Sequence, residues 1–255
     1  MSHPINLLLV RHALSAANLD RRVNMNLPDQ AVPLAPEGHG QAAEAGRAIA
    51  EAILSDPSLR GRVRVLCSPY RRTRKTADEI RKALDAQGIE HDYREEISLR
   101  EISFGLFDGY DDDELKANFP IEHAHYQKHL EMEVKVGDRM TRPGEFWARM
   151  PMGESRAEVA DRVKGAFGTI LRDASMDNPV RIMICVSHGV TLRAFEMQWM
   201  HHPFEWYGQQ TNPNNASVRR ISSDGTSGYQ ASWLFEGFEH VRQSTQDLRE
   251  DGQVG

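Results

Sequence analysis

Residues 5–11 of the chain read INLLLVR, a short apolar run that ends in an arginine. Such a run is typical of a β-strand that is buried on both faces of a sheet. Two further runs resemble it, VRVLC at residues 63–67 and VRIMICV at residues 180–186. Because strands of this kind lie at the centre of parallel sheets, the three runs predict an α/β fold.

The segments that connect these runs carry helical signals. Residues 36–55 are rich in Ala, Glu and Gln with apolar residues at helical spacing, and a second helix is predicted over 72–87. A short strand is expected at 90–94 and a further helix at 191–200. This alternation predicts a three-layer α/β/α domain whose central sheet is mostly parallel.

The second half of the chain adds an insertion and a hairpin. The pattern predicts a helical insertion over about 111–150, and residues 216–222 and 228–234 flank Ser-Asp-Gly, a hairpin signal. The sequence turns polar after Phe238. We therefore expect one domain over 1–238 and a polar, frayed C-terminal tail over 239–255.

The composition limits the classes of function and the location that can be expected for the chain. The chain has 255 residues, 31 lysines and arginines against 37 acidic residues, and a net charge of −6, which disfavours non-specific binding to nucleic acid or to an anionic membrane. No long apolar segment and no signal peptide pattern is evident, so a cytoplasmic protein is expected. Cys67 and Cys185 each end a predicted buried strand and are interpreted as core thiols, with a disulfide between them as the alternative.

Basic and histidine side chains follow each of the three apolar strands. Arg11-His12 leaves the first, residues 68–73 (SPYRRT) leave the second, and Ser187-His188-Gly189 leaves the third. Ligands of open parallel sheets bind outside the carboxyl ends of the strands, so these groups are expected to meet at one edge. Their convergence predicts a binding site for an anion.

Two arginines and two histidines suit a phosphoryl group. An arginine fork binds two phosphate oxygens, a neutral histidine can attack phosphorus, and a second histidine can donate to the oxygens as charge builds. The leaving oxygen needs a proton from a carboxylic acid, and the loop-like stretch LREISFGLFDG at residues 99–109 offers Glu101.

Five motifs resemble those of the phosphoglycerate mutase-like branch of the histidine phosphatase superfamily. RHALSAAN at 11–18 is similar to the signature RHG[EQ][ST]xxN, and SPYRRTRKTA at 68–77 to the second motif. LREISFG at 99–105 resembles the proton-donor motif, SHG at 187–189 the second histidine motif, and GES at 153–155 a lesser element. The motifs stand in the family's order, and the resemblance extends from residue 7 to about 220.

The resemblance implies a role for each matching residue. His12 would be the phosphorylated nucleophile and Glu101 the general acid, then the base for incoming water. Arg11, Arg72 and His188 would form the phosphate pocket, with supporting donors from Ser15, Asn18 and the backbone of Gly189. The family uses no metal, so neither a metal nor another cofactor is expected. The chain departs from the signature at Ala13, which replaces a glycine, and at Leu14, which replaces a polar residue.

Within the family, the expected reaction is hydrolysis of a small phosphomonoester. The insertion after Glu101 does not resemble the substrate loop of the mutases, and GEFWARMPMGES at 144–155 is similar to phosphoglycerate mutase-like proteins of plants and fungi. A mutase-type phosphotransferase is the alternative, and a catalytically inactive relative that binds a phosphorylated ligand is a further one. The substrate and the oligomeric state are left open.

Other motifs have simpler readings. His125 and His129 lie four residues apart and could chelate zinc, but a polar helix face is the favoured interpretation. The acidic residues 111–114 are expected to open a helix. Phe146, Trp147 and Met150 are expected to pack in the core or in a lid, with substrate contact as the alternative.

Overall fold

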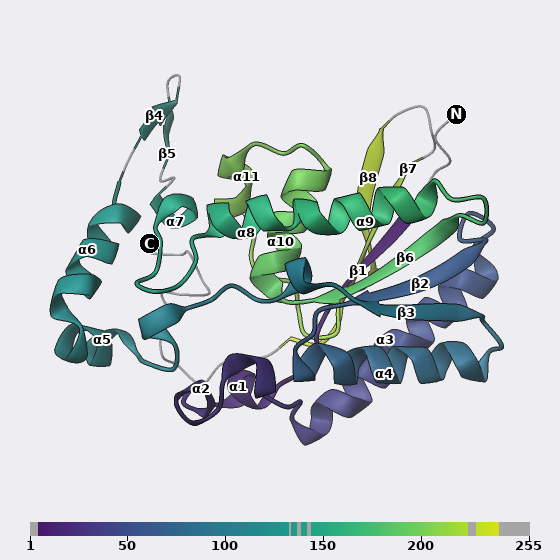
Figure 1. The fold of residues 1–255 in the computed structure, drawn as a ribbon, viewed down its shortest axis with the longest axis horizontal. Helices are drawn as coiled ribbons and strands as arrows, with labels where there is room; N and C mark the ends of the chain where they lie inside the picture. The colour runs from purple at the N-terminus through teal and green to yellow at the C-terminus, as the bar shows by residue number, and fades with distance from the viewer. Residues whose placement is uncertain (1–4, 133, 137–138, 142–143, 224–227, 240–255) are drawn as a thin grey trace.

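A computed structural model gives the structure, which describes all residues except 1–4, 133, 137–138, 142–143, 224–227 and 240–255 (Figure 1). Its main sheet has the strand order β3-β2-β6-β1-β7-β8. The strands are β1 Asn6–Arg11, β2 Arg62–Cys67, β3 His91–Glu95, β6 Val180–Ser187, β7 Val218–Ser223 and β8 Tyr229–Phe235. The helices are α1 Ala16–Leu19, α2 Val23–Asn26, α3 Pro36–Ser55, α4 Arg71–Ala86, α5 Asp112–Asn118, α6 Pro120–Leu130, α7 Gly144–Trp147, α8 Arg156–Arg162, α9 Lys164–Ala174, α10 Gly189–Trp199 and α11 Phe204–Gly208.

The predicted strands all form, and the sheet is mostly parallel. β6 lies between β1 and β2 and is parallel to both, and β3 is parallel to β2. The predicted hairpin forms β7 and β8, which add antiparallel strands beside β1. Of its Ser-Asp-Gly signal, Ser223 ends β7, and Asp224 and Gly225 lie outside the described residues, as does most of the predicted tail.

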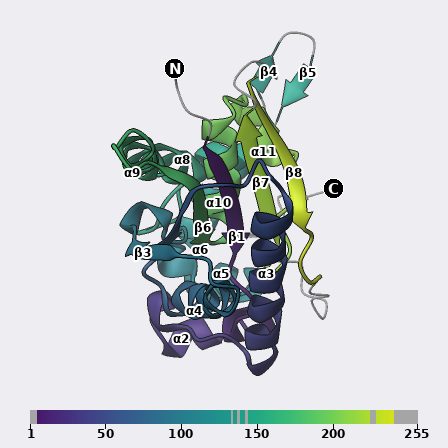
Figure 2. The same cartoon turned by 90° about the vertical axis from the view of Figure 1, so that its right-hand side faces the viewer.

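Helices cover both faces of the sheet. In Figure 1, α3 and α4 lie below the sheet and α8, α9 and α10 lie above it, and Figure 2 shows the same layers from the side. Each face has its own apolar cluster because side chains alternate along a strand: Leu8 and Val10 point to the α3–α4 side, and Leu7 and Leu9 to the α9–α10 side. The three-layer α/β/α prediction is thus confirmed.

The insertion is not entirely helical. α5, α6 and α7 are present, but β4 (Val134–Val136) and β5 (Arg139–Thr141) pair as a small antiparallel sheet. The prediction of a helical insertion thus holds for α5, α6 and α7, and the small sheet is an element that it did not include. The sequence VKV-GD-RMT carries the signal, since β-branched residues flank a Gly-Asp pair that favours a tight turn.

Several local predictions are confirmed. Asp111 caps α5 and accepts from the backbone N–H of Glu114, whose carboxylate accepts from the backbone N–H of Asp111. Phe146 and Met150 are buried in the core, whereas Trp147 is 52% exposed and packs beside Phe146.

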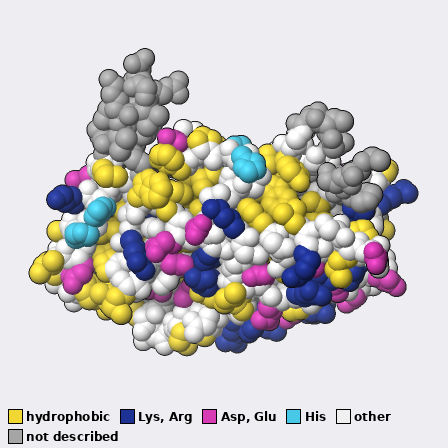
Figure 3. Space-filling view, turned by 45° about the horizontal axis from the view of Figure 1, so that its top comes forward, with side chains coloured by type: hydrophobic (Ala, Val, Ile, Leu, Met, Phe, Trp, Pro, Cys, Tyr) yellow, Lys and Arg dark blue, Asp and Glu magenta, His cyan; other side chains and the backbone are white. Residues whose placement is uncertain are grey.

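The face of the molecule drawn in Figure 3 carries side chains of mixed character. Figure 3 shows hydrophobic side chains in patches that alternate with charged ones. Among the residues that the structure describes, no helix is both long and apolar enough to cross a membrane.

A buried ion pair links β2 to α9. Arg64 and Asp173 are each 1% exposed, Arg64 Nη1 donates to Asp173, and the rest of the guanidinium donates to Asp92. Replacing Asp173 with alanine leaves the buried cation without one of its two carboxylates, so we expect unfolding to become easier by roughly 3–5 kcal/mol. Denaturant titration would measure this, and a loss below about 1 kcal/mol would contradict it. Asp161→Asn is the matched control, because Asp161 is 80% exposed.

Candidate active site

Strand register brings the three predicted segments to one edge of the sheet. Arg11 is paired with Ser187 between β1 and β6, and Cys67 with Val186 between β2 and β6. The residues that follow these strand ends are therefore neighbours. The rings of His12 and His188 lie edge to face with centroids 5.2 Å apart.

His12 is held in the form that a nucleophile requires. Its Nδ1 lies 2.8 Å from the carbonyl oxygen of Ala13, and since a carbonyl only accepts, Nδ1 carries the proton. The lone pair is then on Nε2. Burial, with Arg72 and Arg11 adding to it, holds the pKa of His12 well below its ordinary value of 6.5. The ring is thus neutral and able to attack.

His188 is oriented by Ser68. Its Nε2 lies 2.9 Å from the hydroxyl oxygen of Ser68, and its ring is fully buried. Burial and then Arg72 lower the pKa of His188 well below 6.5. If the Ser68 hydroxyl donates to Nε2, the proton is on Nδ1, which has no hydrogen-bond partner among the described residues. That N–H is a donor for a phosphoryl oxygen.

The two arginines have different partners. Arg11 Nη1 donates to the carbonyl of Pro213 at 2.5 Å. Arg72 is 4% exposed and binds Asp29 with both ends of its fork, Nη1 to Oδ1 at 2.7 Å and Nη2 to Oδ2 at 3.2 Å. A carboxylate thus occupies the geometry in which an arginine binds two oxygens of a phosphate.

Ser15 and Asn18 form the predicted support. They make a capping box at the start of α1, and Asn18 Oδ1 accepts from the backbone and hydroxyl of Ser15 and from Asn215 Nδ2. These contacts engage the acceptor end of the Asn18 amide and orient its NH₂ group as the donor. Gly189 is the first residue of α10, where backbone N–H groups lack helical partners and favour an anion.

Glu101 is 9% exposed, and burial raises its pKa above the ordinary 4.5 in spite of the opposing effect of Arg72. Its Oε1 accepts from the backbone N–H of Ile102 at 2.9 Å, and it lines the same cavity as His12 and Arg72. A buried carboxyl group with a raised pKa is suited to donate a proton.

Ala13 and Leu14, the two residues at which the chain departs from the signature, are both buried. Ala13 is fully buried in the apolar cluster on the α3–α4 side, and its N–H donates to Thr76 Oγ1. Leu14 is 7% exposed, and its N–H donates to the side chain of Gln41. The methyl of Ala13 is thus accommodated by apolar packing.

Sequence reasoning missed three residues of the site. Asp29 binds Arg72, Ser68 orients His188, and Asn215 donates to both the carbonyl of His12 and Asn18. Ser68 lay within a quoted motif and follows a strand end, so position was a usable signal. Asp29 and Asn215 lie in loops with no periodic pattern, and nothing in the sequence links them to this edge.

Histidines and thiols elsewhere do not join the site. The rings of His125 and His129 are 4.6 Å apart, and among the described residues no third His, Cys, Asp or Glu joins them as a metal-binding group. Cys67 and Cys185 are buried and unlinked, as the core-thiol interpretation predicted. Burial raises the pKa of Cys67 to about 12, so it is a poor nucleophile.

The carboxyl edge of the parallel part of the sheet thus holds two buried histidines, two arginines and a buried glutamate, a set of groups that suits a phosphoryl group. The model of the histidine phosphatase superfamily, branch 1, matches residues 7–234. The chain belongs to this superfamily, whose members are phosphatases or mutases.

The names of similar curated proteins agree with a superfamily of phosphatases and mutases. Two phosphoglycerate mutase-like proteins of Arabidopsis thaliana are 34% and 32% identical over 85% and 88% of this chain. The chain spans 64% of the length of the first and 76% of the second. A broad-range acid phosphatase of Saccharomyces cerevisiae is 24% identical, with 88% of this chain and 86% of the yeast protein covered.

Solved structures share the fold. A mycobacterial glucosyl-3-phosphoglycerate phosphatase in complex with inorganic phosphate matches with a TM-score of 0.61 and 19% identity, over 90% of this chain and 95% of that one. A protein from Bacillus stearothermophilus matches with a TM-score of 0.59 and 22% identity, over 90% and 96%. At these identities the likeness concerns the fold.

Proposed function

We propose that this protein is a metal-independent phosphatase that hydrolyses a small phosphomonoester through a phosphohistidine intermediate. One observation carries the proposal: His12 is neutral, with its proton on Nδ1 and its lone pair on Nε2, its ring lies 5.2 Å from that of His188, and burial, with the charges of Arg72 and Arg11, lowers its pKa. This is the arrangement that nucleophilic attack on a phosphoryl group requires.

The steps follow from the residues. Nε2 of His12 forms a bond to phosphorus while the bond to the leaving oxygen breaks, and Glu101 gives that oxygen its proton. Arg11, Arg72 and His188 bind the equatorial oxygens as negative charge builds. A water molecule then attacks the phosphohistidine, Glu101 takes the proton of this water, and His12 is released with inorganic phosphate.

The mechanism needs a neutral His12 and a protonated Glu101 in the same molecule, and the pKa values of these two groups are shifted in opposite directions. At the ordinary values, 6.5 for histidine and 4.5 for glutamate, few molecules would hold a neutral His12 and a protonated Glu101 together. Burial lowers the pKa of His12 and raises that of Glu101, so a larger fraction of molecules holds both forms at once.

The cavity favours a small substrate. It has a volume of about 60 Å³, against the roughly 300–1,000 Å³ of pockets for larger ligands. The buried, unlinked thiols of Cys67 and Cys185 fit the reducing cytoplasm, where we place the protein.

The test is hydrolysis of p-nitrophenyl phosphate in EDTA, together with acid and alkali stability of the protein-bound phosphate after rapid mixing with ³²P-labelled substrate. We expect turnover and a label that is stable to alkali and labile to acid. Loss of turnover in EDTA would contradict metal independence. Interconversion of phosphoglycerates without phosphate release would support the mutase, and binding without any turnover would support the inactive relative.

A further inference from the structure

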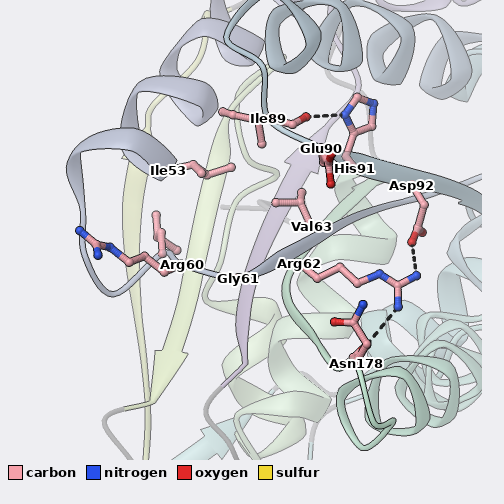
Figure 4. Close-up of a pocket in the computed structure, with 11 residues that line it drawn as sticks. Ile53, Arg60, Gly61, Arg62, Val63, Ile89, Glu90, His91, Asp92 and Asn178 are labelled. Carbon is pink, nitrogen blue, oxygen red and sulfur yellow. Dashed lines mark hydrogen bonds and ion pairs between the residues drawn. The ribbon is translucent and has the colours of Figure 1, made fainter.

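A cavity of about 630 Å³ lies at the amino ends of β2 and β3, opposite the catalytic edge (Figure 4). There, Arg62 donates to Asp92 and to the carbonyl of Asn178, and His91 Nδ1 lies 3.1 Å from the carbonyl of Ile89. Because these groups already bond one another, the cavity gives no reason to place a second site there. The catalytic edge, by contrast, keeps donors that no described residue uses.

Three of the five N–H donors of Arg72 go to a single residue. Nη1 donates to the backbone carbonyl and to Oδ1 of Asp29, both at 2.7 Å, and Nη2 donates to Oδ2 of Asp29 at 3.2 Å. The remaining donors, Nε–H and the second N–H of Nη2, bond no described residue. These two N–H bonds point the same way from one edge of the planar group, so they form a fork for two oxygens.

The unused edge belongs to a residue that lines the active-site cavity. Arg72, His12 and Glu101 lie in the lining of one cavity of about 60 Å³. The side chain of Arg72 is 5% exposed, and its charge adds to the effect of burial in lowering the pKa of both His12 and His188. A phosphoryl group that reaches His12 is therefore also within reach of Arg72.

Tyr70 supports the same placement of Arg72. Carbon Cζ of Arg72 lies over the Tyr70 ring, 5.1 Å from its centroid, and this ring packs edge to face on His188 with centroids 5.0 Å apart. The guanidinium is thus held by a carboxylate on one edge and lies beside an aromatic ring that also contacts the second histidine.

Asp29 is suited to fix a direction. It begins the 3-10 turn η1 (Asp29–Ala31), and both its backbone carbonyl and its carboxylate accept from Arg72. A free arginine side chain has several rotatable bonds. Ordering the side chain before the substrate arrives removes that cost from the reaction.

We propose that Asp29 is a positioning residue, which holds Arg72 through Nη1 and Nη2 so that Nε and Nη2 bind two oxygens of the phosphoryl group during attack by His12. The role of Asp29 rests on the proposed function and concerns the same site. Charge alone would act in the opposite direction, because removal of a carboxylate strengthens the binding of a nearby anion. The direction of the change in Asp29→Asn therefore separates positioning from competition for Arg72.

The test is the release of p-nitrophenol in single-turnover experiments with the enzyme in excess. At saturating enzyme, the limiting rate reports the phosphorylation step and does not depend on the fraction of protein that is folded. In Asp29→Asn an amide NH₂ group replaces one of the two oxygens that accept from Arg72. We expect the limiting rate to fall by roughly 10²-fold, because a displaced Arg72 no longer stabilises the equatorial oxygens.

Arg72→Ala provides the second arm of the test. Since Asp29 acts through Arg72, adding Asp29→Asn to Arg72→Ala is expected to lower the limiting rate by no more than about threefold. Asp113→Asn is the matched control, because Asp113 is 99% exposed and lies outside the cavity lining. This control variant is expected to keep the wild-type limiting rate.

A limiting rate of Asp29→Asn within about threefold of the wild type, or above it, would overturn the proposed role of Asp29. A full loss on top of Arg72→Ala would overturn it as well. Absence of turnover by the wild type would contradict the phosphatase function instead. Calorimetric binding of orthovanadate by the same variants would then decide: weaker binding in Asp29→Asn only where Arg72 is present supports positioning, and equal or tighter binding overturns it.

Discussion

Replacing His12 with alanine is expected to lower kcat for p-nitrophenyl phosphate by about 10⁴-fold or more, with EDTA present throughout. The imidazole forms the bond to phosphorus in the proposed mechanism. The Ala13 carbonyl accepts from its Nδ1–H and leaves the lone pair on Nε2, whereas Nε2 of His188 lies at the Ser68 hydroxyl. Removal of the His12 imidazole therefore takes away the covalent route. Single-turnover assays with labelled substrate would show the loss of the phosphoprotein together with the loss of kcat.

His39→Ala is the matched control, since the side chain of His39 on α3 is 49% exposed. This variant is expected to keep wild-type activity. Comparable turnover by His12→Ala and the wild type would show that His12 is not the nucleophile.

Replacing Glu101 with glutamine is expected to lower kcat by roughly 10²–10⁴-fold for an alkyl phosphate, whose alkoxide leaving group needs a proton. The loss is expected to be much smaller for the phosphorylation step with p-nitrophenyl phosphate, because p-nitrophenolate leaves without protonation. Presteady-state measurement of p-nitrophenol release would separate this step from the attack of water.

The pH dependence gives a second signature of Glu101. A general acid must be protonated, so activity on an alkyl phosphate is lost as pH rises through the raised pKa of Glu101. At the other limit, activity is lost as pH falls through the lowered pKa of His12, where the ring gains a proton. Glu101→Gln is expected to abolish the upper limb alone.

Glu51→Gln is the control for this experiment, because Glu51 is exposed on α3. A retained upper limb in Glu101→Gln, or an equal loss of the phosphorylation rate on alkyl and aryl esters, would assign the proton donor to another group.

Much of the site could be predicted because it lies at strand ends. Arg11, His12 and His188 directly follow or end apolar runs, and the carboxyl ends of parallel strands meet at one edge. Arg72 lies in the segment that leaves the second strand and Glu101 in a loop-like stretch, and the motifs singled out these two residues among their neighbours. Asp29 was missed because its contact with Arg72 joins residues 43 positions apart through a loop.

The sequence by itself determined the fold class and the meeting of Arg11, His12 and His188 at one edge of the sheet, because the apolar runs that form buried strands, and the residues that follow them, can be recognised from local pattern. Only the tertiary structure decided their chemical state. The tautomer of His12 depends on one carbonyl, the opposed pKa shifts of His12 and Glu101 depend on burial, and the pairing of Arg72 depends on a distant carboxylate. Desolvation and charge pairing are set by the neighbours that the folded chain assembles, and the order of residues along the chain does not contain them.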